Sequence, residues 1–148
     1  MPGLLGGFVK IGHLTFIRNR IVRMAETTKP REIAYSFIVP VYNRPQEIRE
    51  LLESLTGQSR RDFEVVVVED GSTLPCRDEV EGFARRLNVQ YVAKENSGQG
   101  FSRNVGFEHA RGHVWILMDS DCLVPTGYLD AVEAGMRERS LDAYGGPD

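Results

Sequence analysis

The sequence predicts an α/β fold, in which helices cover both faces of a mainly parallel sheet. Apolar runs of strand length alternate along the chain with segments whose apolar residues recur at helical spacing. Alternation of this kind indicates βαβ units, whose strands are parallel. The four consecutive valines Val65–Val68 fit a strand that is buried on both faces.

The predicted elements alternate from residue 33 onward. The first strand is predicted over 33–42 and the first helix over 44–59, with Pro45 near its start and Gly57 near its end. The later predictions are a strand at 63–72, a helix at 77–88 that Gly82 shortens, a strand at 89–96, a helix at 98–110, a strand at 113–121, a helix at 125–140 and the start of a strand at 141–148.

Composition limits the classes of function. A chain of 148 residues is long enough for one domain with a hydrophobic core. Its net charge of −3 and the lack of a dense basic run give no reason to expect a nucleic acid partner. Cys76 and Cys122 lie far apart and match no zinc spacing, so free thiols and a cytoplasmic location are expected.

Residues 1–32 are predicted to be an extension, and residues 33–148 to form the domain. Residues 1–23 contain basic but no acidic residues, without the apolar core of a secretory signal. Their glycines oppose a stable membrane-surface helix and favour a partly disordered segment, although peripheral membrane contact stays an alternative. Met24 can also be read as the natural first residue, in which case residues 1–23 would be non-native.

Polar residues follow the ends of the predicted strands. They are YNR at 42–44, EDGS at 69–72 and DSD at 119–121, and a glycine-rich segment at 96–104 follows the remaining strand. In open α/β sheets, ligands bind beyond the carboxyl ends of the strands. The helix that starts in the glycine-rich segment offers free N–H groups that suit a phosphate. We therefore expect a ligand site at this edge of the sheet.

Asp119 and Asp121 are candidate metal ligands. If the strand continues to residue 121, their side chains point to one side, with Cα atoms roughly 6.6 Å apart. Two such carboxylates can share Mg²⁺ or Mn²⁺, which keep waters and bind substrate phosphates. Without a cation they repel, so removal of Asp121 is expected to stabilise the metal-free protein. Spacing alone leaves an alternative, in which one aspartate caps the following helix and the other is solvated.

Other nucleotide and metal motifs do not fit. The segment 98–103 has Arg103 where the dinucleotide fingerprint needs its third glycine, and neither a Walker motif nor an EF-hand is present. His109 and His113 lack the HExxH pattern and are interpreted as surface residues. Cys122 is interpreted as a packed thiol, because no histidine lies near it in the sequence.

Three stretches together resemble the family 2 glycosyltransferases, which are inverting enzymes of the Rossmann-like GT-A fold. Residues 37–59 resemble that family's first strand and helix, and 63–73 resemble its second strand and acidic turn. Residues 95–125, ENSGQGFSRNVGFEHARGHVWILMDSDCLVP, resemble its third block, which ends in a DxD motif. The resemblance covers about residues 35–148.

The resemblance implies a donor site for a nucleotide-diphosphate sugar, commonly a UDP-sugar. It implies seven nucleotide-binding residues: Pro40, Tyr42 and Asn43 around the base and ribose, Asp70 on the base, Gly98 and Arg103 near the base, ribose or diphosphate, and Asp119 near the ribose or metal. It also implies that Asp119 and Asp121 hold Mg²⁺ or Mn²⁺, with Asp121 as the main ligand. Glu69 stands where the family often has aspartate and is equally well read as a solvated acid.

The resemblance places the catalytic base, a carboxylate, beyond Asp148. An inverting transfer needs a base for the acceptor hydroxyl. We therefore expect a chain truncated after the DxD region, inactive alone, whose parent acts in polysaccharide biosynthesis on a sugar, lipid-linked or protein acceptor. Apolar surface exposed by the missing part is expected to favour a homo-oligomer.

Two alternatives stay open. One is a non-catalytic module that binds nucleotide and metal. The other resembles a sugar-1-phosphate nucleotidyltransferase, although residues 41–47, VYNRPQE, stand where that class normally has a glycine-rich basic loop.

We predict that residues 1–23 are dispensable for the fold, because they are rich in glycine and precede the alternating pattern. A chain that starts at Met24 should match the full chain in circular dichroism and in Tm. A loss of several degrees would show that the extension packs on the domain.

Overall fold

The computed structural model describes residues 32–139. The predictions for the extension up to residue 31 and for the strand at 141–148 lie outside the described residues. Within them, the predicted alternation of strands and helices is confirmed. The elements are β1 (Tyr35–Val41), α1 (Pro45–Thr56), β2 (Phe63–Asp70), α2 (Arg77–Phe83), β3 (Val89–Lys94), α3 (Gln99–His109), β4 (Val114–Leu117) and α4 (Tyr128–Arg139).

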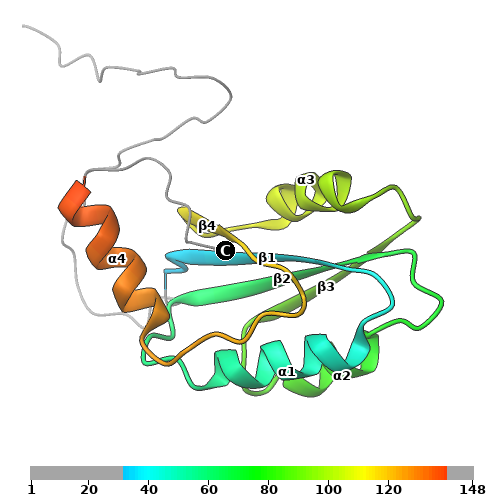
Figure 1. The fold of residues 1–148 in the computed structure, drawn as a ribbon, viewed down its shortest axis with the longest axis horizontal. Coiled ribbons are helices and arrows are strands. Elements are labelled where there is room, and N and C mark those ends of the chain that lie inside the picture. Colours follow the sequence, from blue (N-terminus) through cyan, green and yellow to red (C-terminus); the bar gives the residue numbers. More distant parts are fainter. Residues whose placement is uncertain (1–31, 140–148) are drawn as a thin grey trace, which may run out of the picture.

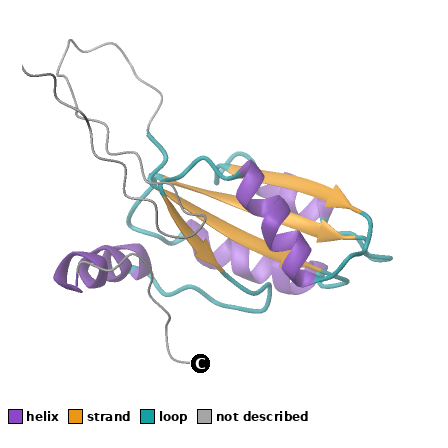
Figure 2. Cartoon of the chain, turned by 90° about the horizontal axis from the view of Figure 1, so that it is seen from above, coloured by secondary structure: helices purple, strands orange, loops and turns teal. Residues whose placement is uncertain are grey.

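The strands form one sheet in the order β3-β2-β1-β4 (Figure 2). All neighbouring strands pair in parallel, as the sequence predicted. The chain therefore moves from β1 to β2 to β3 in one direction and then returns to place β4 on the other side of β1. In Figure 1, α1 and α2 cover one face of the sheet and α3 covers the other. The arrangement is a three-layer α/β fold.

The main core lies between the sheet and α1. Ile48, Leu51, Leu52 and Leu55 recur at helical spacing on α1 and are fully buried. They meet the apolar side chains that alternate along β1, such as Phe37, in one cluster. Burial of this stripe orients α1 along the sheet, so that its first residue follows the carboxyl end of β1.

Helix α4 packs near the amino ends of the strands (Figure 1). Leu129 is fully buried, and the ring of Tyr128 lies 6.3 Å from that of Phe37, centroid to centroid. Two polar contacts join α4 to the segment before β2: Ser59 donates to Asp130 at 2.6 Å, and Arg60 pairs with Glu133.

One carboxylate is buried completely within the sheet. Glu64 on β2 accepts hydrogen bonds from Ser36 Oγ at 2.7 Å, from the backbone N–H of Arg111 at 2.6 Å and from Gln90 at 3.0 Å. Burial opposes ionisation, but these bonds and the Arg111 guanidinium outweigh it and lower the pKa of Glu64. The carboxylate thereby holds the segment between α3 and β4 against the interior strand β2.

Pro40 lies where β1 and β4 separate. The two strands pair from Tyr35 to Ile38, and the carbonyl of Ile38 accepts from Met118 N at 3.1 Å. Backbone groups of alternate residues point to the same neighbouring strand, so the N–H that Pro40 lacks would face β4. Since β4 has already ended at Leu117, proline costs no ladder hydrogen bond here.

The prediction that the fourth strand continues to residue 121 is wrong. Asp119 and Asp121 lie in the turn that follows β4, where the carbonyl of Asp119 accepts from Cys122 N at 3.3 Å. The strand argument for their side chains pointing to one side therefore does not apply. Helix α4 begins only at Tyr128, so neither aspartate caps it.

Several smaller predictions concern surface and core residues. His109 and His113 are exposed, both cysteines are free thiols, and Cys122 packs against the core, all as predicted. Cys76 is buried, which the sequence did not predict. Among the described residues β4 is an edge strand, and Trp115 and Leu117 on it are 42% and 50% exposed. No helix within residues 32–139 is long and apolar enough to cross a membrane.

Gly106 sets how closely α3 approaches the sheet. A Cβ at this position would overlap Cγ2 of Ile38 on β1, whereas a Cβ at Gly100 on the same helix meets nothing within 4 Å. We predict that Gly106→Ala lowers the free energy of unfolding by about 1–3 kcal/mol, as expected for overpacking. The control Gly100→Ala should leave it unchanged or raise it by up to about 1 kcal/mol. Equal effects of the two variants in urea unfolding would contradict the close contact.

Candidate functional site

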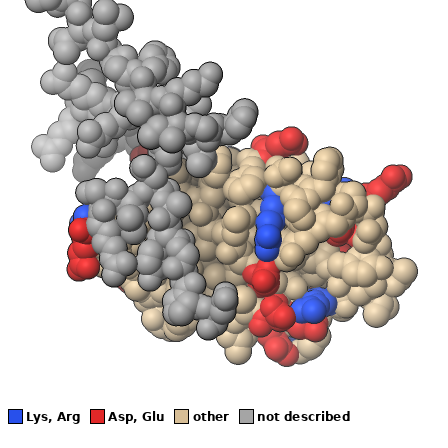
Figure 3. Space-filling view, turned by 45° about the horizontal axis from the view of Figure 1, so that its top comes forward, with Lys and Arg blue, Asp and Glu red and all other residues tan. Residues whose placement is uncertain are grey.

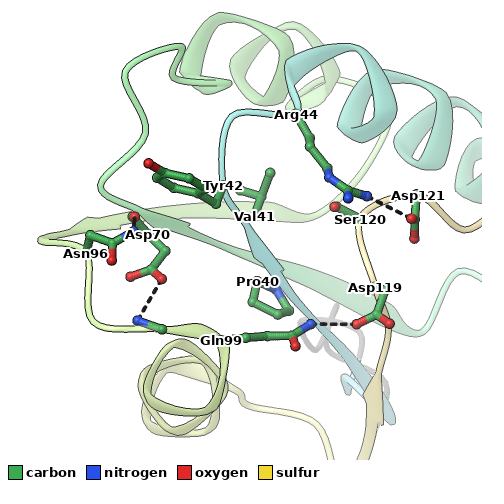
Figure 4. A pocket seen from close by; sticks show the side chains of 11 residues that line it. Pro40, Val41, Tyr42, Arg44, Asp70, Asn96, Gln99, Asp119, Ser120 and Asp121 are labelled. Carbon is green, nitrogen blue, oxygen red and sulfur yellow. Dashed lines mark hydrogen bonds and ion pairs between the residues drawn. The ribbon is translucent and has the colours of Figure 1, made fainter.

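A hollow of about 460 Å³ lies at the carboxyl edge of the sheet (Figure 4). It is lined by Pro40, Val41, Tyr42, Arg44, Asp70, Asn96, Gly98, Gln99, Asp119, Ser120 and Asp121. These residues come from the ends of β1 and β2, from the segments that follow β1 and β4, and from the region that leads into the first turn of α3. The hollow thus opens where the strand order reverses, which is where open α/β sheets bind ligands.

Asp70 anchors one wall of the hollow. It is buried at the end of β2 and accepts hydrogen bonds from the backbone N–H groups of Ser97 and Gly98, each at 2.9 Å, and from Lys94. Burial opposes its ionisation, but the hydrogen bonds and the charge of Lys94 outweigh that effect and lower the pKa of Asp70. The N–H groups of Ser97 and Gly98 are therefore used by Asp70, and both precede α3, which starts at Gln99. The expectation that N–H groups at the start of this helix suit a phosphate stays a prediction.

The turn after β2 packs closely on the segment before α3. Gly71 has φ of 67°, and a Cβ there would lie 2.5 Å from the backbone nitrogen of Asn96. The side chain of Asn96 in turn donates to the carbonyl of Asp70 at 2.9 Å. Glycine is needed at position 71 both for the backbone conformation and for this contact.

Asn43 fastens the loop after β1 to the loop after β2. Its side-chain oxygen accepts from the backbone N–H groups of Thr73 and Leu74 at 2.8 and 2.9 Å, and its own N–H donates to Ser72 Oγ at 2.7 Å. Its φ of 54° is a conformation that asparagine tolerates better than most residues. Asn43 does not line the hollow, but the contacts hold its neighbour Tyr42, which does and is 49% exposed.

Glu69 faces away from the hollow, toward α2. It is 3% exposed and accepts hydrogen bonds from Cys76 N at 2.7 Å, from Tyr91 Oη at 3.2 Å and from Ser72 Oγ. Burial of Tyr91 and the charge of Glu69 raise the pKa of Tyr91 to about 12. The interpretation of Glu69 as a solvated acid is wrong, since the residue organises the turn after β2.

Asp119 and Asp121 each pair with an arginine from a different helix region. Arg44 Nη1 lies 2.7 Å from Asp121 Oδ2, and Arg103 Nη2 lies 3.1 Å from Asp119 Oδ1, to which Gln99 also donates at 2.8 Å. Both aspartate side chains are more than half exposed, at 56% and 55%. Two guanidinium groups thus supply positive charge that offsets the repulsion between the two carboxylates. Stabilisation on removal of Asp121 is no longer expected, because that removal also breaks an ion pair.

The two aspartates offer only oxygen ligands, which suit Mg²⁺ or Mn²⁺. Within residues 32–139, no three His, Cys, Asp or Glu side chains gather into a group that could hold a metal ion. A cation on Asp119 and Asp121 therefore needs further oxygens from water or from a bound diphosphate. Mg²⁺ sites of this kind use one or two carboxylates with substrate phosphates, so the residues present fit the ion.

The structure brings together most residues that the sequence singled out. Six of them line the same hollow: Pro40, Tyr42, Asp70, Gly98, Asp119 and Asp121. Asn43 and Arg103 do not line it but form hydrogen bonds that hold its walls. The buried Nε of Arg103 has no hydrogen-bond partner in the part of the chain that the structure describes. Acidic and basic side chains also lie next to one another on the face shown in Figure 3.

Sequence reasoning assigned no role to Arg44, Gln99 or Lys94. Lys94 has a usable signal, since Asp70 and Lys94 are Cα partners at the ends of β2 and β3. Opposite charges at matching ends of two consecutive predicted strands would have indicated this pair. Arg44 and Gln99 gave no such signal, because their partners are 77 and 20 residues away in segments without regular pairing.

Comparison with known proteins identifies related sequences. The sequence model described as "Glycosyl transferase family 2" matches residues 36–147. The poly(ribitol-phosphate) beta-N-acetylglucosaminyltransferase TarS of Staphylococcus aureus is 41% identical over 112 residues, which are 73% of this chain and 20% of TarS. The chain thus spans about a fifth of the length of this relative.

Solved structures are similar as well. The S. aureus TarS 1-349 complex with UDP-GlcNAc has a TM-score of 0.68 at 33% identity, and the match covers 78% of this chain and 37% of that one. The mannosyltransferase PcManGT of Pyrobaculum calidifontis, in complex with GDP-Man and Mn²⁺, has a TM-score of 0.58 at 30% identity, with 67% and 33% covered. The predicted resemblance and the GT-A fold are confirmed.

We predict that Asp70→Asn shows a pH-dependent loss of stability. Because folding lowers the pKa of Asp70, its charge stabilises the fold above the ordinary carboxyl value of about 3.9. That contribution is lost as the pH falls through the lower pKa of the folded state. At about pH 7 the variant should lose about 1.5–3 kcal/mol of unfolding free energy, typical of hydrogen bonds to a charged group.

Urea unfolding from about pH 7 to below the ordinary carboxyl pKa measures the free energy of unfolding of both proteins. The difference between wild type and Asp70→Asn should narrow steadily below the ordinary carboxyl pKa. Asp78→Asn, at an exposed position on α2, controls for the loss of one negative charge. A difference that stays constant with pH would show that Asp70 does not act through its charge.

Proposed function

This chain belongs to glycosyl transferase family 2, and we propose that its hollow binds the nucleotide diphosphate of a sugar donor. The expected donor is a UDP-sugar, and the whole protein would transfer the sugar to an acceptor hydroxyl with the help of a divalent cation. One observation carries the proposal: six of the residues singled out in the sequence line one hollow at the reversal of strand order. Because the chain belongs to this family, we no longer propose a sugar-1-phosphate nucleotidyltransferase.

The base end of the donor would lie between Tyr42 and Asp70. Tyr42 presents a half-exposed aromatic ring at the hollow, and an aromatic ring is a suitable surface for a base. A carboxylate offers about four lone-pair sites, of which Lys94, Ser97 and Gly98 use three at Asp70. One acceptor site remains for an N–H of the base. This count favours uracil, whose ring N–H can donate while Asp70 stays ionised.

The diphosphate end would lie at Asp119 and Asp121. A divalent cation there supplies positive charge that offsets the negative charge developing on the leaving diphosphate. Within the protein, Gln99 and Arg103 hold Asp119 from α3 and so fix one ligand relative to the helix. One similar solved structure is a complex with UDP-GlcNAc and another is a complex with GDP-Man and Mn²⁺, which supports a nucleotide sugar and a metal.

Acceptor binding and its deprotonation are proposed to need residues outside 32–139. An inverting transfer requires a base within about 3 Å of the acceptor hydroxyl. The carboxylates at the hollow are already used: Asp70 by three donors, and Asp119 and Asp121 by the arginines. We propose that a carboxylate beyond Asp148 is the base, so that this chain alone binds the donor without transferring sugar.

Calorimetric titration tests the proposal. UDP should bind in the presence of Mn²⁺, more weakly without it, and more tightly than other nucleoside diphosphates. Asp121→Ala should abolish the Mn²⁺-dependent part of the affinity and change the free energy of unfolding by no more than about 1 kcal/mol, since its ion pair is exposed.

The matched control is Asp78→Ala, an exposed aspartate on α2 that should bind like wild type. Mn²⁺-dependent UDP affinity that survives in Asp121→Ala would refute the metal assignment. Equal affinity for all nucleoside diphosphates would refute the proposed contact between Asp70 and uracil.

A further inference from the structure

The guanidinium of Arg44 contacts Asp121, which is the proposed main ligand of the divalent cation. We propose that Arg44 is an internal counter-cation that competes with the divalent cation for Asp121, so that the metal binds well only together with a nucleotide diphosphate. The inference rests on the proposed function of the hollow. Arg44 is a positioning residue in this account, since it acts through Asp121.

The geometry of the ion pair fits a replaceable contact. Arg44 follows β1 and precedes α1, and its side chain points toward Asp121 in the turn after β4 (Figure 4). One bond joins the pair, Nη1 to Oδ2 at 2.7 Å, and both side chains are about half exposed, at 46% and 55%. Among the described residues, no protein donor bonds Oδ1 of Asp121, and the half-exposed carboxylate is accessible to solvent.

Asp119 is held differently from Asp121. Two donors on α3, Gln99 and Arg103, converge on one oxygen of Asp119. Loss of either donor still leaves the other, whereas Asp121 depends on Arg44 alone within residues 32–139. The two carboxylates of the DxD motif therefore differ: one is fixed to a helix, and the other can change its partner.

Displacement of Arg44 is physically accessible. An exposed ion pair contributes little to stability, because solvent screens it and two side chains lose freedom to form it. A divalent cation on the same carboxylate carries more charge than the guanidinium and repels it. A metal ion on Oδ1 and the guanidinium on Oδ2 would repel each other, so metal binding favours the departure of Arg44.

The displaced guanidinium stays at the rim of the hollow, because its backbone follows β1 directly. With no anion present, it faces a bound metal ion and weakens metal binding. A diphosphate in the hollow gives Arg44 a new partner, since guanidinium groups bind phosphate oxygens well. Arg44 thus couples the two ligands: nucleotide improves metal binding, and by linkage metal improves nucleotide binding by the same factor.

The test measures Mn²⁺ binding by electron paramagnetic resonance of the free ion, with and without saturating UDP. Arg44→Gln should bind Mn²⁺ alone about two- to five-fold more tightly than wild type, the range set by an exposed ion pair. The factor by which UDP improves Mn²⁺ binding should be smaller in this variant. Arg44→Lys keeps the charge and should behave like wild type.

Arg49→Gln removes an exposed arginine from α1, the helix that follows Arg44, and controls for net charge. An equal gain in Mn²⁺ affinity in this control, or no gain in Arg44→Gln, would overturn the role of Arg44 while leaving donor binding intact. If no variant binds Mn²⁺ even with UDP, the proposed function fails and the inference fails with it. The two failures are therefore distinguishable.

Discussion

The reversal of strand order at β1 is the constraint on which the rest of the structure depends. Because all four strands are parallel, every carboxyl end and the loop after it lie at one edge of the sheet. Because β2 and β4 lie on opposite sides of β1, the loops that follow β1 and β4 diverge and leave a hollow between them. Pro40 marks this point, since it lies just past the last pair of β1 and β4.

Polar contacts between loops then give the hollow its shape. Asp70 joins β2 to the start of α3, and Asn43 joins the loop after β1 to the loop after β2. Arg44 joins the loop after β1 to the turn after β4. Each wall of the hollow is thus tied to another wall by a side chain from a distant part of the chain. The arrangement combines an aromatic surface, a buried carboxylate with one free acceptor site, and two exposed carboxylates.

The sequence allowed the fold to be predicted because its signals are local. The valine run of β2 and the leucine stripe of α1 fixed the element types and the parallel sheet. The predicted end of β4 was too late. The apolar run in the sequence continues to Met118, whereas the pairing of β4 with β1 ends at Leu117, where the two strands diverge. The strand ends correctly indicated the edge of the sheet at which the hollow lies. Contacts such as Arg44 with Asp121 span 77 residues and left no local pattern.

The most direct measurement of the central claim is paramagnetic broadening of backbone amide signals by Mn²⁺ in the presence of UDP. If the hollow is the donor site, signals around Asp121, Ser120 and Gly98 should broaden first, because these residues line it. A second hollow, lined in part by Thr56, Arg61 and Asn88, lies away from this edge and should be unaffected. Broadening that begins at this second hollow, with the Asp121 signals unchanged, would contradict the assignment of the donor site.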